Sequence, residues 1–185
     1  IDRSGESATR NLQTEKVNAD SLNADANKSF TKGKLFYGWE YVYNKVGSTG
    51  LHTNINSSIS VPAVSRYPDG STWSTAGVYS SYTVNINRQF TFTTGLRYNY
   101  NSLYAKFDTT FIKFPYKEAS IRNGAVTANT GIVYRPSATW QLNGNISTGY
   151  RMPNIDDVGK LFESAPGFVT VPNPALKPEY AWNFE

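Results

Sequence analysis

Apolar and polar residues alternate along most of the chain with a period of two. Over residues 90–100, one parity carries Phe90, Phe92, Leu96, Tyr98 and Tyr100, while the other carries mainly Thr, Arg and Asn. This period is typical of a β-strand whose two faces meet different surroundings, and helical spacing fits poorly. The same pattern predicts strands over residues 35–43, 76–86, 90–100, 126–135 and 140–151, a less regular first strand over 10–26, and a seventh that begins at Tyr180.

The predicted strands are joined alternately by short and long connections. Short ones cover residues 27–34, 87–89 and 136–139, and long ones cover 44–75, 101–125 and 152–179. An up-and-down outer-membrane barrel has tight turns at one rim and long loops at the other, whereas the Greek-key connections of a sandwich need not keep this order. Aromatic residues of one parity gather near both rims, as interfacial girdles do. Among them are Phe90 and Trp140 next to the short connections and Tyr100 and Tyr150 next to the long ones. The chain is therefore predicted to be all-β, a transmembrane antiparallel up-and-down β-barrel.

Composition agrees with this fold and excludes several others. Aromatic residues make up 15% of the 185 residues, although the mean hydropathy is −0.48. A barrel with a lipid-facing apolar parity and a wet lumen averages to such values. No apolar run approaches the roughly 20 residues of a transmembrane helix, and residues 1–4 lack the features of a signal peptide. The chain has no Cys and one His, which excludes thiol chemistry and multi-His metal sites.

Seven strands do not close a barrel of the usual even number. The last predicted strand also stops at Glu185, only a few residues after it begins. We therefore expect the chain to be one part of a larger barrel.

Two sequence boxes flank the last long connection. The first is Tyr150-Arg151-Met152-Pro153, and the second is Asn173-Pro174-Ala175-Leu176-Lys177-Pro178-Glu179. With Arg66-Tyr67-Pro68-Asp69-Gly70-Ser71, Thr94-Gly95-Leu96-Arg97-Tyr98 and Tyr37-Gly38-Trp39-Glu40, they make nearly the whole chain resemble TonB-dependent outer-membrane receptors.

This resemblance implies a 22-stranded barrel of the bacterial outer membrane, with a plug domain and a TonB box that lie outside these residues. It also implies the partners: outer-membrane lipid, the TonB complex acting through the plug, and an iron chelate or haemoprotein, with no nucleic acid and no resident cofactor. Such a protein is a transporter and not an enzyme.

The transported ligand is less well defined. The two boxes look most like those of haem receptors, in which a His between the boxes typically binds haem. Residues 158–172 contain no His, and the single His52 lies in the predicted loop 44–75. Haem and a ferric siderophore both stay open as ligands.

The candidate ligand-binding residues are Arg151, Asp156, Asp157, Asn173 and His52. Arg97, Arg135 and Arg151 fall on the lumen-facing parity, where they would contact an anionic ligand or the plug, or pair with a wall carboxylate such as Glu40. The two adjacent aspartates would bind Ca²⁺ or, as the more favoured alternative, open a short helix.

Two other classes of protein would also contain alternating strands. A barrel with an enzymatic or adhesive role, such as an outer-membrane protease or lipase, needs His beside carboxylates or Ser, and a single loop His argues against it. A soluble β-sandwich binding module would be monomeric without detergent. The basic residues are spread over separate turns, which does not favour nucleic-acid binding.

Overall fold

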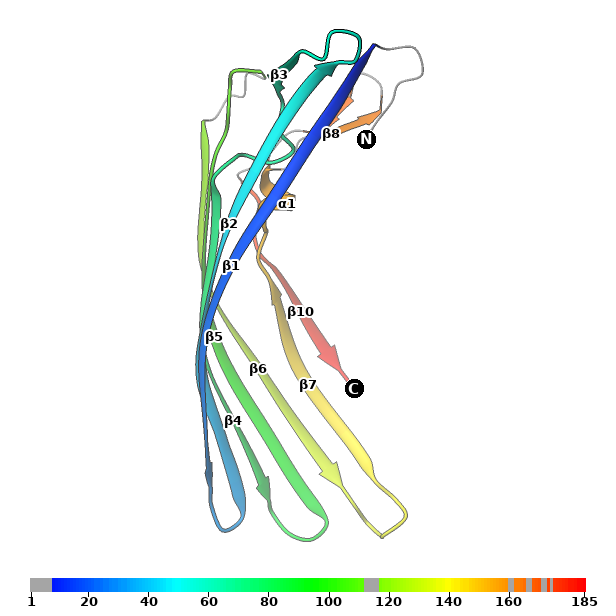
Figure 1. Ribbon diagram of the computed structural model, residues 1–185. Coiled ribbons are helices and arrows are strands. Elements are labelled where there is room, and N and C mark those ends of the chain that lie inside the picture. The colour runs from blue at the N-terminus through cyan, green and yellow to red at the C-terminus, as the bar shows by residue number, and fades with distance from the viewer. Residues whose placement is uncertain (1–7, 112–116, 160–161, 166–167, 171–172, 174) are drawn as a thin grey trace.

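The computed structural model describes residues 8–111, 117–159, 162–165, 168–170, 173 and 175–185. Its main feature is one antiparallel sheet in which each strand pairs with the next long strand of the chain, in the order β1-β2-β4-β5-β6-β7-β10 (Figure 1). The bounds are β1 Thr9–Ser29, β2 Gly33–Asn54, β4 Ser71–Asn85, β5 Phe90–Lys106, β6 Glu118–Tyr134, β7 Leu142–Arg151 and β10 Glu179–Phe184. The prediction of an all-β, up-and-down sheet is confirmed, and all seven predicted strands are present.

Three smaller strands and one helix belong to the long connections. Strand β3 (Ser60–Ala63) pairs with β2, and β8 (Phe162–Ala165) pairs with β9 (Phe168–Thr170) in a separate hairpin. Helix α1 spans Ile155–Gly159. None of the helical segments in the described residues is long and apolar enough to cross a membrane.

The two ends of the sheet differ as the connection lengths predict. Figure 1 shows three tight hairpins at the bottom, which we call the short-turn rim, and the longer connections at the top, which we call the long-loop rim. In one tight turn the Asn87 side chain accepts hydrogen bonds from the backbone N–H groups of Gln89 and Phe90. Such an Asx turn reverses the chain with local contacts alone.

The strands extend further than the alternation predicts. Strand β2 continues to Asn54 and β4 begins at Ser71, so strands occupy both ends of the predicted loop 44–75. Strands β5 and β6 likewise enter the predicted loop 101–125, of which residues 112–116 lie outside the described residues. Backbone pairing needs no apolar face, so a ladder can continue where both faces are polar and the sequence pattern is lost.

The two faces of the sheet have different chemistry. The outer face carries large apolar side chains that stay exposed, including Tyr37, Trp39, Tyr41, Val78, Leu96, Tyr98, Tyr100, Val126, Ile132, Leu142 and Ile146. Because the opposite parity is mostly polar and smaller, the outer face is the one suited to hydrocarbon. The other face, which we call the inner face, bears α1 at the long-loop rim.

A small core fixes α1 to the inner face. Leu103 and Ala105 lie on the same parity of β5, and Phe107 follows the end of the strand. These three side chains pack with Ala119 of β6 and with Met152 and Val158 around the helix. Leu103 and Val158 are completely buried. This core is the only cluster of buried apolar side chains found among the described residues, and it lies beside the loops and not in the middle of the wall.

Strands β6 and β7 pair over only part of their length. Their ladder covers Asn129–Tyr134 of β6. Beyond it, the Thr148 hydroxyl accepts a hydrogen bond from the Ala128 N–H at 2.9 Å and donates one to the Ala128 carbonyl at 3.3 Å. A side chain thus takes the place of the next backbone pair, and β7 leaves β6 here.

This divergence corrects one expectation about the aromatic residues. The alternation places Tyr150 in the outer girdle, but Tyr150 packs against the rim core and its hydroxyl accepts a hydrogen bond from Asn101 of β5. Parity predicts a face only while the strand stays in the sheet.

Candidate functional site

The first turn of α1 is organised by Asn154. Its side-chain oxygen accepts hydrogen bonds from the backbone N–H groups of Asp156 at 2.8 Å and Asp157 at 3.1 Å. The Asp157 carboxylate in turn accepts the Asn154 N–H at 3.0 Å. This reciprocal arrangement is a capping box, and acidic side chains also suit the positive end of a helix. The expectation that the two aspartates open a short helix is confirmed.

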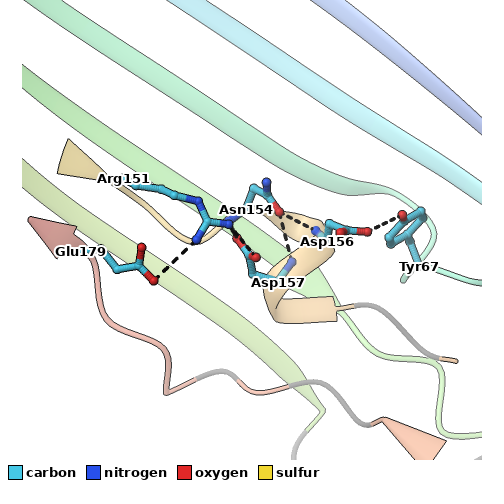
Figure 2. A network of polar contacts seen from close by, with 6 residues as sticks. All are labelled: Tyr67, Arg151, Asn154, Asp156, Asp157 and Glu179. Carbon is cyan, nitrogen blue, oxygen red and sulfur yellow. Dashed lines mark hydrogen bonds and ion pairs between the residues drawn. The ribbon is translucent and has the colours of Figure 1, made fainter. Parts of the chain in front are cut away.

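Arg151 joins α1 to both strands at its base. One terminal guanidinium nitrogen lies 2.8 Å from each carboxylate oxygen of Asp157, and the other lies 3.6 Å from Glu179 of β10 (Figure 2). The hydrogen bond and charge of Asp157 raise the pKa of Arg151 further above its ordinary value. Its positive charge is therefore shared between two carboxylates at the point where β7 ends.

Tyr67 connects α1 to a different loop. Its hydroxyl donates a 2.6 Å hydrogen bond to Asp156 (Figure 2). Burial, followed by the hydrogen bond to Asp156, raises the pKa of the Tyr67 phenol. A carboxylate that accepts a hydrogen bond from a phenol O–H stabilises the neutral phenol, so this contact is in place at neutral pH.

The loop that carries Tyr67 is itself held against β2. Ser48 accepts the Tyr67 N–H at 3.2 Å through its side chain, and its own N–H donates to Asp69 at 2.9 Å. Pro68 is buried, and a Cβ added at Gly159 would lie 3.0 Å from its ring. The end of α1 therefore packs closely against this loop.

Asn173 meets the same helix through its backbone. Its N–H donates to the Val158 carbonyl at 3.0 Å, and its side chain accepts the Ala175 N–H at 3.0 Å. Four of the five predicted ligand-binding residues, namely Arg151, Asp156, Asp157 and Asn173, are thus brought together around α1. We call them, with Tyr67, Asn154 and Glu179, the rim network.

His52 does not belong to the rim network and does not lie in a loop. It is on β2, opposite Asn11 of β1, and its Nδ1 lies 2.5 Å from the Asn11 side-chain oxygen. The expected loop position was wrong because β1 and β2 continue their pairing far beyond the apolar segment. In the structure the side-chain partner of His52 is therefore Asn11.

A second polar cluster crosses the inner face at mid-height. Arg97 of β5 forms an ion pair with Glu40 of β2 and lies 5.1 Å from the Tyr79 ring. Tyr79 in turn donates a hydrogen bond to Asp25 of β1. Of the two alternatives for Arg97, pairing with the wall carboxylate Glu40 is therefore the one present in the structure.

Sequence reasoning did not find Asp25 and Tyr79. They are 54 residues apart, and they meet because Gly38 lies between them in the register of β1, β2 and β4. A Cβ at Gly38 would lie 2.9 Å from the Tyr79 hydroxyl. Only the strand register, and not the local sequence, could have revealed this contact.

The two clusters present polar side chains that are held in place by their partners. No group of three or more His, Cys, Asp or Glu side chains is placed to hold a metal ion within the described part of the chain. Both clusters are made of paired charges and hydrogen bonds, which fix side chains in place and present polar atoms on the inner face. Such surfaces suit the recognition of a ligand or of another polypeptide.

Comparison with known families agrees with this description. Residues 2–185 match the family model described as TonB dependent receptor-like, beta-barrel. The chain belongs to this family. The chain is also 35% identical over 104 residues to hemoglobin-haptoglobin utilization protein B of Neisseria meningitidis serogroups C and A, a match that covers 54% of this chain and 13% of the relative.

Solved structures of the same kind share the fold. The haemophore receptor HasR of Serratia marcescens, solved with its haemophore HasA and haem, covers 94% of this TonB-dependent receptor segment at a TM-score of 0.70 and 16% identity. The copper transporter OprC covers 79% at 0.65 and 13% identity, and the ferric citrate transporter FecA covers 77% at 0.54 and 16% identity. The segment spans 29%, 23% and 21% of those chains. All three proteins are named as receptors or transporters.

Proposed function

We propose that this chain forms part of the wall and long-loop rim of an outer-membrane receptor that imports haem or a ferric siderophore with energy from TonB. The family match over residues 2–185 carries this proposal. The apolar outer face would contact lipid, the polar inner face would contact a plug domain, and the long-loop rim would face the outside of the cell.

Haem is the ligand that we favour. The supporting observations are that hemoglobin-haptoglobin utilization protein B and HasR, by their names, act on haemoproteins or haem. The alternative ligand is an iron chelate, which is supported by the similarity to the ferric citrate transporter FecA. Since His52 pairs with Asn11, haem recognition would rest on other rim residues or on parts of the receptor outside this chain.

In this proposal the rim network positions the ligand-binding loop. Arg151, Asp157 and Glu179 anchor both ends of the connection between β7 and β10, while Tyr67 and Asp156 attach it to the neighbouring loop. A loop fixed in this way loses less conformational entropy when ligand binds.

The experiment is a growth test of the intact receptor that contains this chain, in a Gram-negative host without its own haem and ferric citrate receptors. Iron would be supplied only as haemin, haemoglobin or ferric citrate. We expect growth on haemin or haemoglobin. Growth on ferric citrate alone would instead assign a chelate, and no growth on any source at normal receptor levels would contradict iron import by these ligands.

A pair of variants tests the role of the rim. Arg151→Gln removes the ion pairs at the long-loop rim, and we expect it to weaken haemin binding about threefold to tenfold through a less ordered loop. Arg135→Gln makes the same change at the short-turn rim, where Arg135 bonds to Gln141, and should bind haemin normally. Equal effects of both changes would argue that Arg151 has no special part in binding.

A further inference from the structure

Strand β6 has an edge without a partner strand above the point where β7 leaves it. The Ala128 backbone bonds to the Thr148 hydroxyl on the β7 side, and successive residues of a strand turn their backbone groups to opposite sides. Every second residue above Ala128 therefore turns its N–H and C=O toward the β7 side. Within the described part of the chain, no strand pairs with β6 on this side above Asn129. What we call the open edge consists of the exposed residues Ser120, Arg122, Gly124 and Val126.

The end of β7, residues 148–151, presents matching backbone groups, and we call it upper β7. Lower in the strand, Asn145 exchanges two backbone hydrogen bonds of 3.0 Å with Glu185 at the end of β10. The odd-numbered residues of β7 therefore face β10. The even-numbered residues Thr148 and Tyr150 turn their N–H and C=O groups toward β6. Upper β7 and the open edge are thus complementary, although they are not paired in the structure.

The side chains of upper β7 fit the same register. The ladder ends with Asn129 opposite Ser147, and continuing its register would place Tyr150 opposite Val126 on the outer face. There Tyr150 would belong to the aromatic girdle in which the alternation predicts it. In the structure Tyr150 lies on the inner side instead, where its hydroxyl accepts a 3.3 Å hydrogen bond from Asn101. The sequence of upper β7 therefore suits a second position beside β6.

The contacts of the observed position can be replaced by those of the second one. The Thr148 hydroxyl occupies the Ala128 backbone at 2.9 and 3.3 Å, and Tyr150 is held by Asn101 and by packing against the rim core. In the second position the backbone groups of Thr148 and Tyr150 would bond to Ala128 and Val126. Hydrogen bonds of similar strength are exchanged, so the net change in free energy is small.

We propose that upper β7 exchanges between two positions, one folded over the inner face, as observed, and one paired with the open edge of β6. Strand β10 moves with it, because β10 pairs with β7 up to Arg151. In the paired position Tyr150 reaches the outer face and upper β7 leaves the inner face. The two positions follow from strand pairing alone, whereas their effect on access from the long-loop rim rests on the proposed function.

Pairs of cysteines detect the paired position in the intact receptor, since this chain has no cysteine of its own. Thr127→Cys with Gly149→Cys joins an inner-face pair of the continued register. A Cβ at Gly149 would lie 3.7 Å from its nearest atom, so the side chain is accommodated. Asn129→Cys with Ser147→Cys, at the last pair of the observed ladder, is the matched control. Because a disulfide needs closely spaced Cα atoms, we expect the control pair to form about tenfold faster.

A second change shifts the balance between the two positions. Tyr150→Phe keeps the ring and removes the hydrogen bond with Asn101, so the Thr127–Gly149 disulfide should form about fivefold faster. Tyr180→Phe makes the same change on the residue that pairs with Tyr150, and it should leave the rate unchanged. Formation of the Asn129–Ser147 disulfide in each variant confirms that the sheet has folded.

Two results would overturn the proposal. No Thr127–Gly149 disulfide, where the Asn129–Ser147 disulfide forms, would mean that upper β7 does not reach the open edge. Equal rates for both pairs, unchanged by Tyr150→Phe, would mean that β7 stays paired with β6 and does not exchange. Neither result bears on iron import, which the growth test decides separately.

Discussion

Replacing Val158 with alanine tests what fastens α1 to the wall. Val158 is completely buried in the rim core, and the substitution removes two methyl groups worth about 0.8 kcal/mol each, plus a cavity term. We expect the docked state of α1 to lose about 2 kcal/mol, which is about a 30-fold shift in its population. A helix of five residues is too short to persist once undocked.

Hydrogen exchange of backbone amides in the intact receptor measures this shift. The Val158 N–H donates to Asn154 and the Asn173 N–H donates to Val158, both at 3.0 Å. Both bonds depend on the docked helix, so both amides should exchange about 30-fold faster in the variant when local opening limits exchange.

A matched control makes the same substitution on a surface. Val126 is 57% exposed on the outer face of β6, and Val126→Ala should leave exchange at α1 unchanged. Unchanged exchange of the Val158 and Asn173 amides in Val158→Ala would refute the reasoning, because it would mean that the polar contacts of the rim network hold α1 without the core.

Three further predictions concern the contacts between loops and between strands. Tyr67→Phe removes the 2.6 Å hydrogen bond to Asp156 and should reduce the stability of the loop's attachment to α1 by about 1 kcal/mol. Backbone amides in residues 64–70 should then exchange faster. Unchanged protection of these amides would mean that the other contacts of the loop hold it in place. The pKa of Tyr67 in the folded state is raised above 10.0. The hydrogen bond should therefore contribute fully to stability below pH 10 and weaken as the pH rises through the raised pKa. NMR of labelled tyrosine would follow this titration. Gly38→Ala places a Cβ 2.6 Å from the Ala24 carbonyl and should lower the yield of folded receptor, whereas Gly144→Ala, with its nearest atom 3.7 Å away, should not; equal yields would contradict the close approach.

The apolar alternation predicted every long strand and the ends at the short turns, but it missed the ends of β2, β4, β5 and β6 at the long loops. Residues 90–100 alternate clearly because one face must be apolar where it meets hydrocarbon, and β5 includes this segment. Strand β2 continues through Lys45, Ser48 and His52 to Asn54, where polar residues occupy both faces. There the strand is specified by pairing with β1, and a single sequence does not show pairing.

The candidate site was partly accessible from the sequence. The adjacent Asp156 and Asp157 predicted the start of a short helix, and both lie in the first turn of α1. The capping role of Asn154 was not predicted. Tyr67 was not predicted because it lies 89 residues from its partner. Its contact depends on how two loops fold over the same rim, which is a property of the tertiary structure.

The Thr148 hydroxyl that ends the β6–β7 ladder gives the wall unequal stiffness. Below it, displacing β7 from β6 would break the backbone hydrogen bonds of Asn129–Tyr134. Above it, the described contacts that hold β7, α1 and β10 to the rest of the wall are made largely by side chains of the rim core and rim network. Side-chain contacts can be exchanged one at a time, so β7, α1 and β10 can shift above this point, whereas β1 to β6 stay joined by backbone ladders up to the long-loop rim. In the proposed receptor, movement of this segment would open the rim to a ligand while the rest of the wall stays closed.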